Sequence, residues 1–88
     1  MDQSNKDMVF FCLEFVKNNV YEQSQNVQCR IWIKNAVEII EKSSLENADF
    51  LVLNLHAVDA FFSGHDSSST TNNIIDKVKL IEALLKDV

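Results

Sequence analysis

His56 and Asp59 are the residues best placed for chemistry, because they stand three positions apart within a long apolar segment. Side chains at this spacing share one face of a helix, and an aspartate beside a histidine can perform acid–base catalysis. No nucleophile accompanies the pair, so we expect no enzyme. The pattern favours a histidine at a helix edge or interface with an acid as its polar partner. A pH-sensitive contact is the third alternative, since histidine titrates near neutrality.

Two further groups of chemically capable residues give weaker signals. His65, Asp66 and Ser67 are the residue types of a hydrolase triad, but consecutive residues in a polar loop cannot converge in triad geometry. Cys12 and Cys29 have neither the spacing of zinc ligands nor a nearby histidine at such spacing. We therefore expect no catalytic residue, no metal and no cofactor, and two buried free thiols. A disulfide between them would require an oxidising compartment.

The charge balance narrows the class of partner. The chain has 88 residues and a net charge of −5, which disfavours binding to nucleic acids and to anionic membranes. No apolar run approaches the ~18 residues of a membrane span, and no signal peptide is visible. We therefore expect a cytoplasmic or otherwise intracellular protein. Residues 45–66 contain acids but no Lys or Arg, a pattern that would steer a basic partner.

The absence of proline and the presence of one glycine, Gly64, leave long stretches without helix breakers. The sequence predicts an all-α, compact, four-helix bundle-like single domain that spans residues 1–88 and self-associates. The expected helices cover residues 7–22, 27–42, 45–62 and 74–87, with a flexible Ser/Thr-rich loop at 63–73. Gly64 is expected to stop the third helix.

Three of the predicted helices carry an apolar stripe at helical spacing. The stripes comprise Val9, Leu13, Val16 and Val20 in the first helix, Cys29, Ile33, Ala36 and Ile40 in the second, and Ile74, Val78, Ile81, Leu85 and Val88 in the last. Arg30, Lys34, Glu38 and Glu41 occupy the opposite face of the second helix. Ile31 departs from the apolar stripe of its helix, which predicts that it meets another surface.

The third predicted helix is apolar on nearly every side. Ser43 and Glu46 have the spacing of a capping box and mark its expected start. A helix that is apolar all round is a buried one, so it is either the central helix of the bundle or the helix that faces a second subunit. The run Phe50–Leu55 is also compatible with a strand, but the pattern continues too far for that and favours a helix.

An apolar content of 47% on so small a domain leaves apolar surface that folding alone does not cover. We therefore expect a protein–protein interaction module, namely a regulator, inhibitor or adaptor, that forms a homodimer and binds another protein, with a basic protein as one candidate. The expected partner-binding residues are Trp32, Phe50, Asn54, His56, Asp59, Phe61 and Phe62. The alternative is a helix-turn-helix-like nucleic-acid-binding regulator that uses Arg30 and Lys34 of the second helix.

Overall fold

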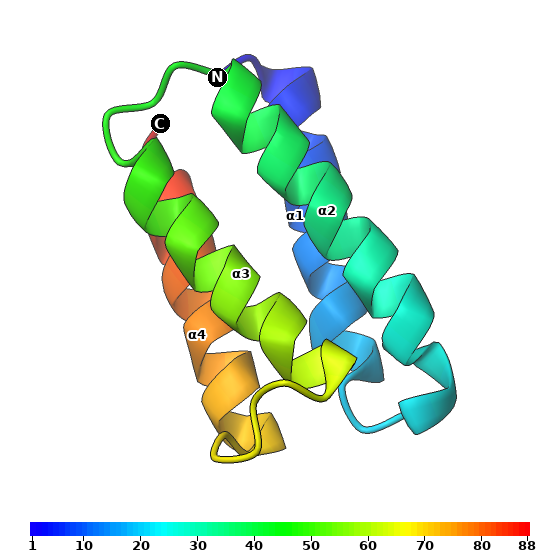
Figure 1. Cartoon of the computed structure of the whole chain (residues 1–88). Coiled ribbons are helices and arrows are strands. Elements are labelled where there is room, and N and C mark those ends of the chain that lie inside the picture. Colours follow the sequence, from blue (N-terminus) through cyan, green and yellow to red (C-terminus); the bar gives the residue numbers. More distant parts are fainter.

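Four antiparallel helices make up the computed structural model, which describes all residues 1–88 (Figure 1). The helices are α1 (Gln3–Asn19), α2 (Asn26–Lys42), α3 (Ala48–Ser63) and α4 (Thr71–Leu85), and a short 3-10 helix at Gln23–Gln25 precedes α2. The all-α, four-helix fold predicted from the sequence is confirmed. The alternative of a strand at Phe50–Leu55 is wrong, because this run lies within α3.

Polar caps set the starts of α1 and α4, and both helices begin earlier than their apolar stripes indicated. Asp2 Oδ1 accepts a hydrogen bond from the backbone N–H of Asn5 at 2.8 Å, so α1 begins at Gln3 instead of residue 7. Thr70 and Asn73 form a reciprocal capping box at 2.9 and 3.2 Å, so α4 begins at Thr71 instead of residue 74. A helix start is therefore fixed by the residue that satisfies the free N–H groups.

The junction between α2 and α3 corrects the capping box expected at Ser43 and Glu46. Ser43 Oγ donates to the carbonyl of Ile39 at 2.6 Å, so this side chain closes the end of α2. Ser44 then adopts a left-handed conformation with φ of 55°, and α3 begins only at Ala48. The stop at Gly64 is confirmed, since its φ is 82° and its N–H donates to the last turn of α3.

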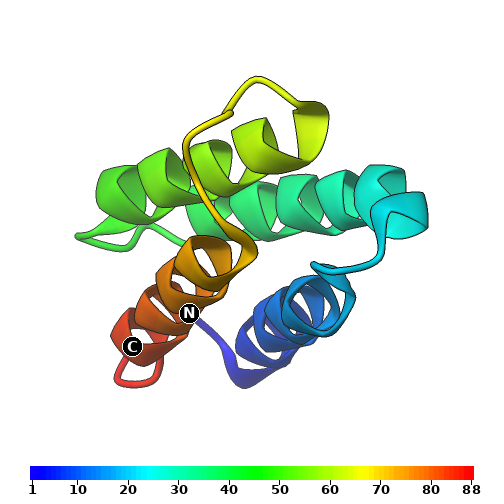
Figure 2. The same ribbon diagram turned by 90° about the horizontal axis from the view of Figure 1, so that it is seen from below.

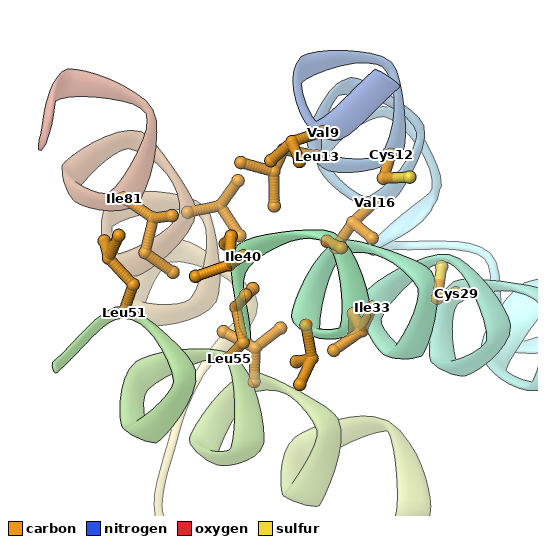
Figure 3. Packing of buried hydrophobic residues seen from close by; sticks show 14 of the residues in the cluster. Val9, Cys12, Leu13, Val16, Cys29, Ile33, Ile40, Leu51, Leu55 and Ile81 are labelled. Carbon is orange, nitrogen blue, oxygen red and sulfur yellow. The ribbon is translucent and has the colours of Figure 1, made fainter. Parts of the chain in front are cut away.

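The interior is a single apolar core to which all four helices contribute. Its 18 buried residues include no polar or charged side chain, and Figure 3 shows side chains from all four helices meeting there. The predicted stripes are buried except for Val88, which is 40% exposed because α4 ends at Leu85. No helix combines the length and the apolar character needed to cross a bilayer.

The helices follow one another around the bundle, so each has two neighbours. α2 packs between α1 and α3, and α4 completes the ring against α3 and α1. Viewed from the end of the bundle, α2 and α3 form one layer and α1 and α4 the other (Figure 2). The expectation that α3 is the central helix is therefore wrong. Its core residues lie on one side, whereas Phe50 and Leu53 remain exposed.

Two lysines of α1 link this helix to α4 and to the residues that follow α4. Lys17 Nζ bridges Glu14 at 3.0 Å and Glu82 at 2.8 Å, which joins α1 to α4. These contacts raise the pKa of Lys17 against the opposing effect of its desolvation. Lys6 Nζ donates to the carbonyls of Lys86 and Val88 at 2.6 and 3.1 Å. On the outer side of the α2–α3 layer, where the candidate site lies, one ion pair links the two helices, that of Arg30 with Asp59.

Candidate functional site

The outward side of the α2–α3 layer carries two stripes of residues whose spacing alternates between four and three. One stripe lies on each helix: Val27, Ile31, Lys34, Glu38 and Glu41 on α2, and Asp49, Leu53, His56, Ala60 and Ser63 on α3. We call these residues the α2–α3 face. An alternating spacing of this kind keeps side chains on one side of a helix over several turns. The face therefore runs along most of both helices.

An open groove follows this face between the two helices. The hollow nearer the start of α2 measures about 440 Å³ and is lined by Val27, Arg30, Ile31, Ile33, Lys34, Val37, His56 and Asp59. A second hollow nearer the start of α3 is lined by Glu41, Ala48, Asp49, Val52, Leu53 and His56. His56 lines both, so the two hollows are neighbours along the face.

Apolar side chains stand at the rim of this groove and remain in solvent. Val27 is 72% exposed and Leu53 is 68% exposed, while Ile31 is 46% exposed. Exposed apolar residues also occur on other parts of the molecule, as at Phe11 and Leu80, but these three gather around the hollows of one face. Ile31, which departs from the core stripe of its helix, lies outside the core and lines the groove; that it meets another surface stays a prediction.

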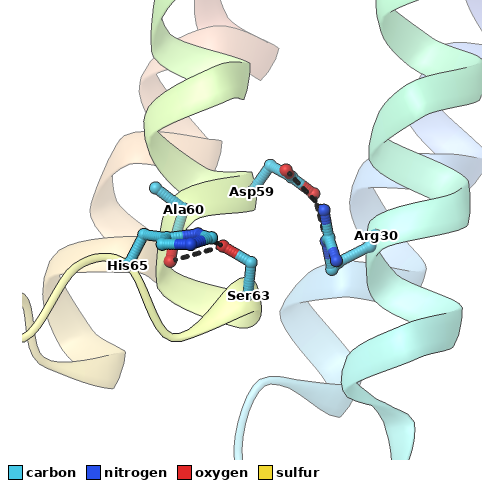
Figure 4. A network of polar contacts seen from close by, with 5 residues as sticks. All are labelled: Arg30, Asp59, Ala60, Ser63 and His65. Atoms are coloured by element: carbon cyan, nitrogen blue, oxygen red, sulfur yellow. Dashed lines mark hydrogen bonds and ion pairs between the residues drawn. The ribbon is translucent and has the colours of Figure 1, made fainter.

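Asp59 is paired with Arg30 across the groove instead of with His56. Arg30 Nε lies 3.0 Å from Asp59 Oδ1, and Arg30 Nη2 lies 3.4 Å from Asp59 Oδ2 (Figure 4). This hydrogen-bonded contact raises the pKa of Arg30. His56 is exposed on the next turn of α3 and shares no hydrogen bond with Asp59. The expected acid partner of His56 is therefore engaged elsewhere.

Charge is distributed unevenly along the α2–α3 face. Lys34 and the ion pair of Arg30 with Asp59 lie on the half nearer the start of α2, whereas Glu38, Glu41 and Asp49 lie on the other half. None of the three ion pairs of the chain involves Lys34 or these acids. Lys42 and Glu46 follow the acidic half and balance one another. The face thus has a basic half, whose unpaired charge is that of Lys34, and an acidic half with three unpaired carboxylates.

Trp32 lies on the other side of α2, against α1. Its ring packs edge-on against Phe11, with centroids 5.3 Å apart, and is tilted against Phe15 at 5.9 Å. The indole Nε1–H is buried without an acceptor from the chain. Trp32 is thus separated from the groove by the width of its helix.

The remaining expected binding residues occupy different parts of α3. Phe62 belongs to the core at 4% exposure and meets the half-buried Phe61 in an edge-on contact at 5.3 Å. Phe50 is 48% exposed. Asn54 Nδ2 donates to the carbonyl of Phe50 at 2.8 Å, so its amide is satisfied within α3. Of the seven expected residues, only His56 and Asp59 line the main groove.

His65 and Asp66, two of the three residues with triad residue types, bond to different partners and not to each other. His65 Nδ1 pairs with Ser63 Oγ at 2.8 Å (Figure 4). The Asp66 carboxylate instead accepts from Ser68 and Ser69, and these bonds lower its pKa to about 2. The arrangement closes the turn between α3 and α4.

Both cysteines are buried free thiols, as the sequence predicted. Burial raises the pKa of Cys12, and it raises the pKa of Cys29 to about 11. A thiol is reactive as its thiolate, so both side chains are protected from oxidation and alkylation while the chain is folded.

Comparisons of the chain with protein-family models, curated proteins and solved structures return no match. A function is therefore inferred from the α2–α3 face itself. Sequence reasoning missed most of this face, including Val27, Ile31 and Leu53 as binding residues. The alternating spacing of the two stripes is visible in the sequence. The stripes form one surface only because α2 and α3 pack side by side, which the sequence does not reveal.

Proposed function

We propose that this chain is a small helical protein–protein interaction module that acts as a homodimer through the α2–α3 face. Regulator, inhibitor and adaptor are the roles that such a module serves. The observation that carries the proposal is the exposure of Val27, Ile31 and Leu53 at two neighbouring hollows of one face. The proposal concerns binding alone, and no reaction is assigned to the face.

The energetic argument rests on apolar area and symmetry. Burying a large aliphatic side chain is worth about 1.5–3 kcal/mol, and a two-fold dimer makes each contact twice. Association costs on the order of 4–15 kcal/mol in lost translational and rotational freedom. Leu53 and Ile31, each buried in two copies, offset a cost in the lower part of this range. A single copy of the face against a flat surface would gain only half as much.

The nucleic-acid alternative receives less support from the same residues. Arg30 is engaged by Asp59, which leaves Lys34 as the free cation of the face. A helix-turn-helix also places its helices at ~90–120°, whereas α2 and α3 run antiparallel side by side (Figure 1). Phosphate binding relies on several unpaired basic residues, and the acids Glu38, Glu41 and Asp49 would repel the backbone.

The test is the mass of the chain in solution, measured by sedimentation equilibrium from micromolar to submillimolar concentration. We expect a reversible dimer for the wild type and a folded monomer for Leu53→Asp. Leu80→Asp is the matched control, since Leu80 is an exposed leucine on α4 at 46% exposure, and this variant should dimerise normally. A wild type that stays monomeric throughout, or a dimer lost in Leu80→Asp and kept in Leu53→Asp, would contradict the proposal.

A further inference from the structure

We infer that the occupant of the α2–α3 face is a second copy of the chain in an antiparallel orientation, related by a two-fold axis that crosses the helices near Leu53. The inference rests on the proposed function and deepens it by giving the orientation of the two subunits. Its starting observation is the division of the face into a basic half and an acidic half, which makes it complementary to itself when reversed. A surface with a single sign of charge would repel its own copy.

The Arg30–Asp59 ion pair fixes the register of α2 against α3, so positions along the face can be compared. At a rise of 1.5 Å per residue, Lys34 lies about 6 Å and Glu38 about 12 Å from the level of this pair. Leu53 lies about 9 Å from the same level by the same rise. Leu53 therefore stands midway between Lys34 and Glu38, and a two-fold axis at its level exchanges these two charges.

The same axis brings His56 opposite Asp49 of the partner subunit. His56 lies about 4.5 Å and Asp49 about 15 Å from the level of the ion pair, so their midpoint is close to Leu53. Glu41, at about 16.5 Å, is exchanged with a level about 1.5 Å from the ion pair, which is the level of Ile31. Lys34 thus faces Glu38 of the partner subunit, His56 faces Asp49 of the partner subunit, and Leu53 meets Leu53 of the partner subunit.

A parallel arrangement of two copies fails on the same residues. With the axis along the helices, α2 packs on α3 of the partner subunit at equal height. Glu41 then meets Asp49 of the partner subunit, since both lie about 15–16.5 Å from the level of the ion pair. Like charges in contact across an interface cost several kcal/mol. The antiparallel arrangement replaces this repulsion with opposite charges.

The size of the face is sufficient for a dimer of two such small subunits. The bundle measures 33 × 20 × 18 Å, so one long side has a projected area of roughly 660 Å², close to the ~800 Å² per partner of a standard interface.

Charge reversal tests the orientation. We expect Lys34→Glu and Glu38→Lys each to weaken dimerisation at least about tenfold, because each variant creates two like-charge contacts. The double variant Lys34→Glu/Glu38→Lys restores opposite charges and should return to within a few-fold of the wild type. Lys79→Glu on α4 is the control and should leave the dimer unchanged. Sedimentation equilibrium measures the dissociation constants, and circular dichroism checks that each variant is folded.

The outcomes separate this inference from the proposed function. A dimer that is lost in Leu53→Asp but is indifferent to both single reversals, or is not restored in the double variant, would overturn the antiparallel orientation and leave the interaction module standing. A wild type without any dimer would overturn both.

Cysteine cross-linking gives a second measurement that does not depend on charge. Leu53→Cys should form an intermolecular disulfide under oxidised glutathione, because the two positions meet at the axis and a disulfide requires Cα atoms within about 7 Å. Val27→Cys should not, since its two copies would lie about 27 Å apart along the helices. The buried native thiols do not compete. Equal cross-linking of both variants, or of Val27→Cys alone, would overturn the orientation.

Discussion

Leu53 and Leu55 stand two positions apart on α3, and the helix turns them to opposite sides of the molecule. Leu55 is 0% exposed in the core, whereas Leu53 is 68% exposed on the α2–α3 face. The two residues are chemically identical, so the difference in their roles comes from the side of the helix alone. The inner side of α3 holds the fold together, and the outer side is available for association.

The contrast extends to polar groups. The core contains no polar or charged side chain, so it has no charge pattern by which to choose a partner. The α2–α3 face combines apolar residues with charges of both signs, and charges contribute specificity more than affinity. A substitution in the core should change the stability of the fold, and a substitution on the α2–α3 face should change association.

The largest expected effect is on the core side. Leu55→Ala should lower the free energy of unfolding by about 2–5 kcal/mol, because it removes buried methyl groups and leaves a cavity. Leu53→Ala should change the free energy of unfolding of the monomer by less than about 0.5 kcal/mol, as at other surface sites. Urea unfolding followed by circular dichroism under monomeric conditions measures both. If the two variants lost similar free energies of unfolding, Leu53 would contribute to the stability of the fold as much as Leu55 does.

A second effect comes from Cys29 on the inner side of α2. Its pKa is raised from 9.0 to about 11 by burial. Below pH 9 the thiol is protonated in both the folded and the unfolded chain. Between pH 9 and 11 only the unfolded chain ionises, so the free energy of unfolding should fall over this interval. The fall from pH 8 to 11 should be smaller in Cys29→Ala, which has no thiol at this position.

Urea unfolding at several pH values in the two chains gives the comparison, and each chain serves as its own reference at pH 8. An identical alkaline loss in both chains would assign the effect to other groups, such as Lys17, whose raised pKa also makes the folded state lose stability at high pH.

Gly64 ends α3, and its substitution should have a smaller effect on the free energy of unfolding. Its φ of 82° is unfavourable for residues with a Cβ, although no atom lies within 4 Å of the position that a Cβ would take. Gly64→Ala should therefore cost about 1–2 kcal/mol from backbone strain alone. Gly64→Asn should cost less, since asparagine tolerates this conformation. Thermal unfolding measures the order wild type, Asn, Ala, and an alanine variant as stable as the wild type would contradict it.

The smallest expected effect on stability belongs to the outer face. Lys34→Glu should leave the free energy of unfolding of the monomer within about 0.5 kcal/mol of the wild type. The same substitution is the one expected to disrupt the dimer. Measuring the free energy of unfolding and the dimer dissociation constant on one sample of this variant distinguishes an effect on the fold from an effect on association. A large loss of monomer stability would mean that Lys34 contributes to the fold.

The helices and most of the core were predictable from the sequence because burial requires a repeating apolar position. Ile33, Ala36 and Ile40 fall on such a repeat, and all three are buried. The helix starts were less predictable, because several Ser, Thr, Asp and Asn residues compete to cap each helix. Ser43 satisfies the end of α2 and so cannot begin α3. Local pattern alone does not reveal which of these bonds a side chain makes.

The candidate site was harder to predict than the fold. Periodicity separates inside from outside but does not say which helices are neighbours. Trp32 was expected to bind a partner, yet its side of α2 is turned to α1. Val27 and Leu53 come from different helices and form one surface only after α2 and α3 pack side by side. The pairing of Asp59 with Arg30 depends on the same packing.

Trp32 has one more consequence for anyone who studies this chain in solution. It is the only tryptophan of the chain, and the phenylalanine rings of α1 surround it on the flank opposite the groove. Its fluorescence emission should shift when the α1–α2 pair comes apart and stay constant when subunits meet or separate. Trp32 is thus an intrinsic optical reporter of unfolding that should not respond to the proposed dimerisation.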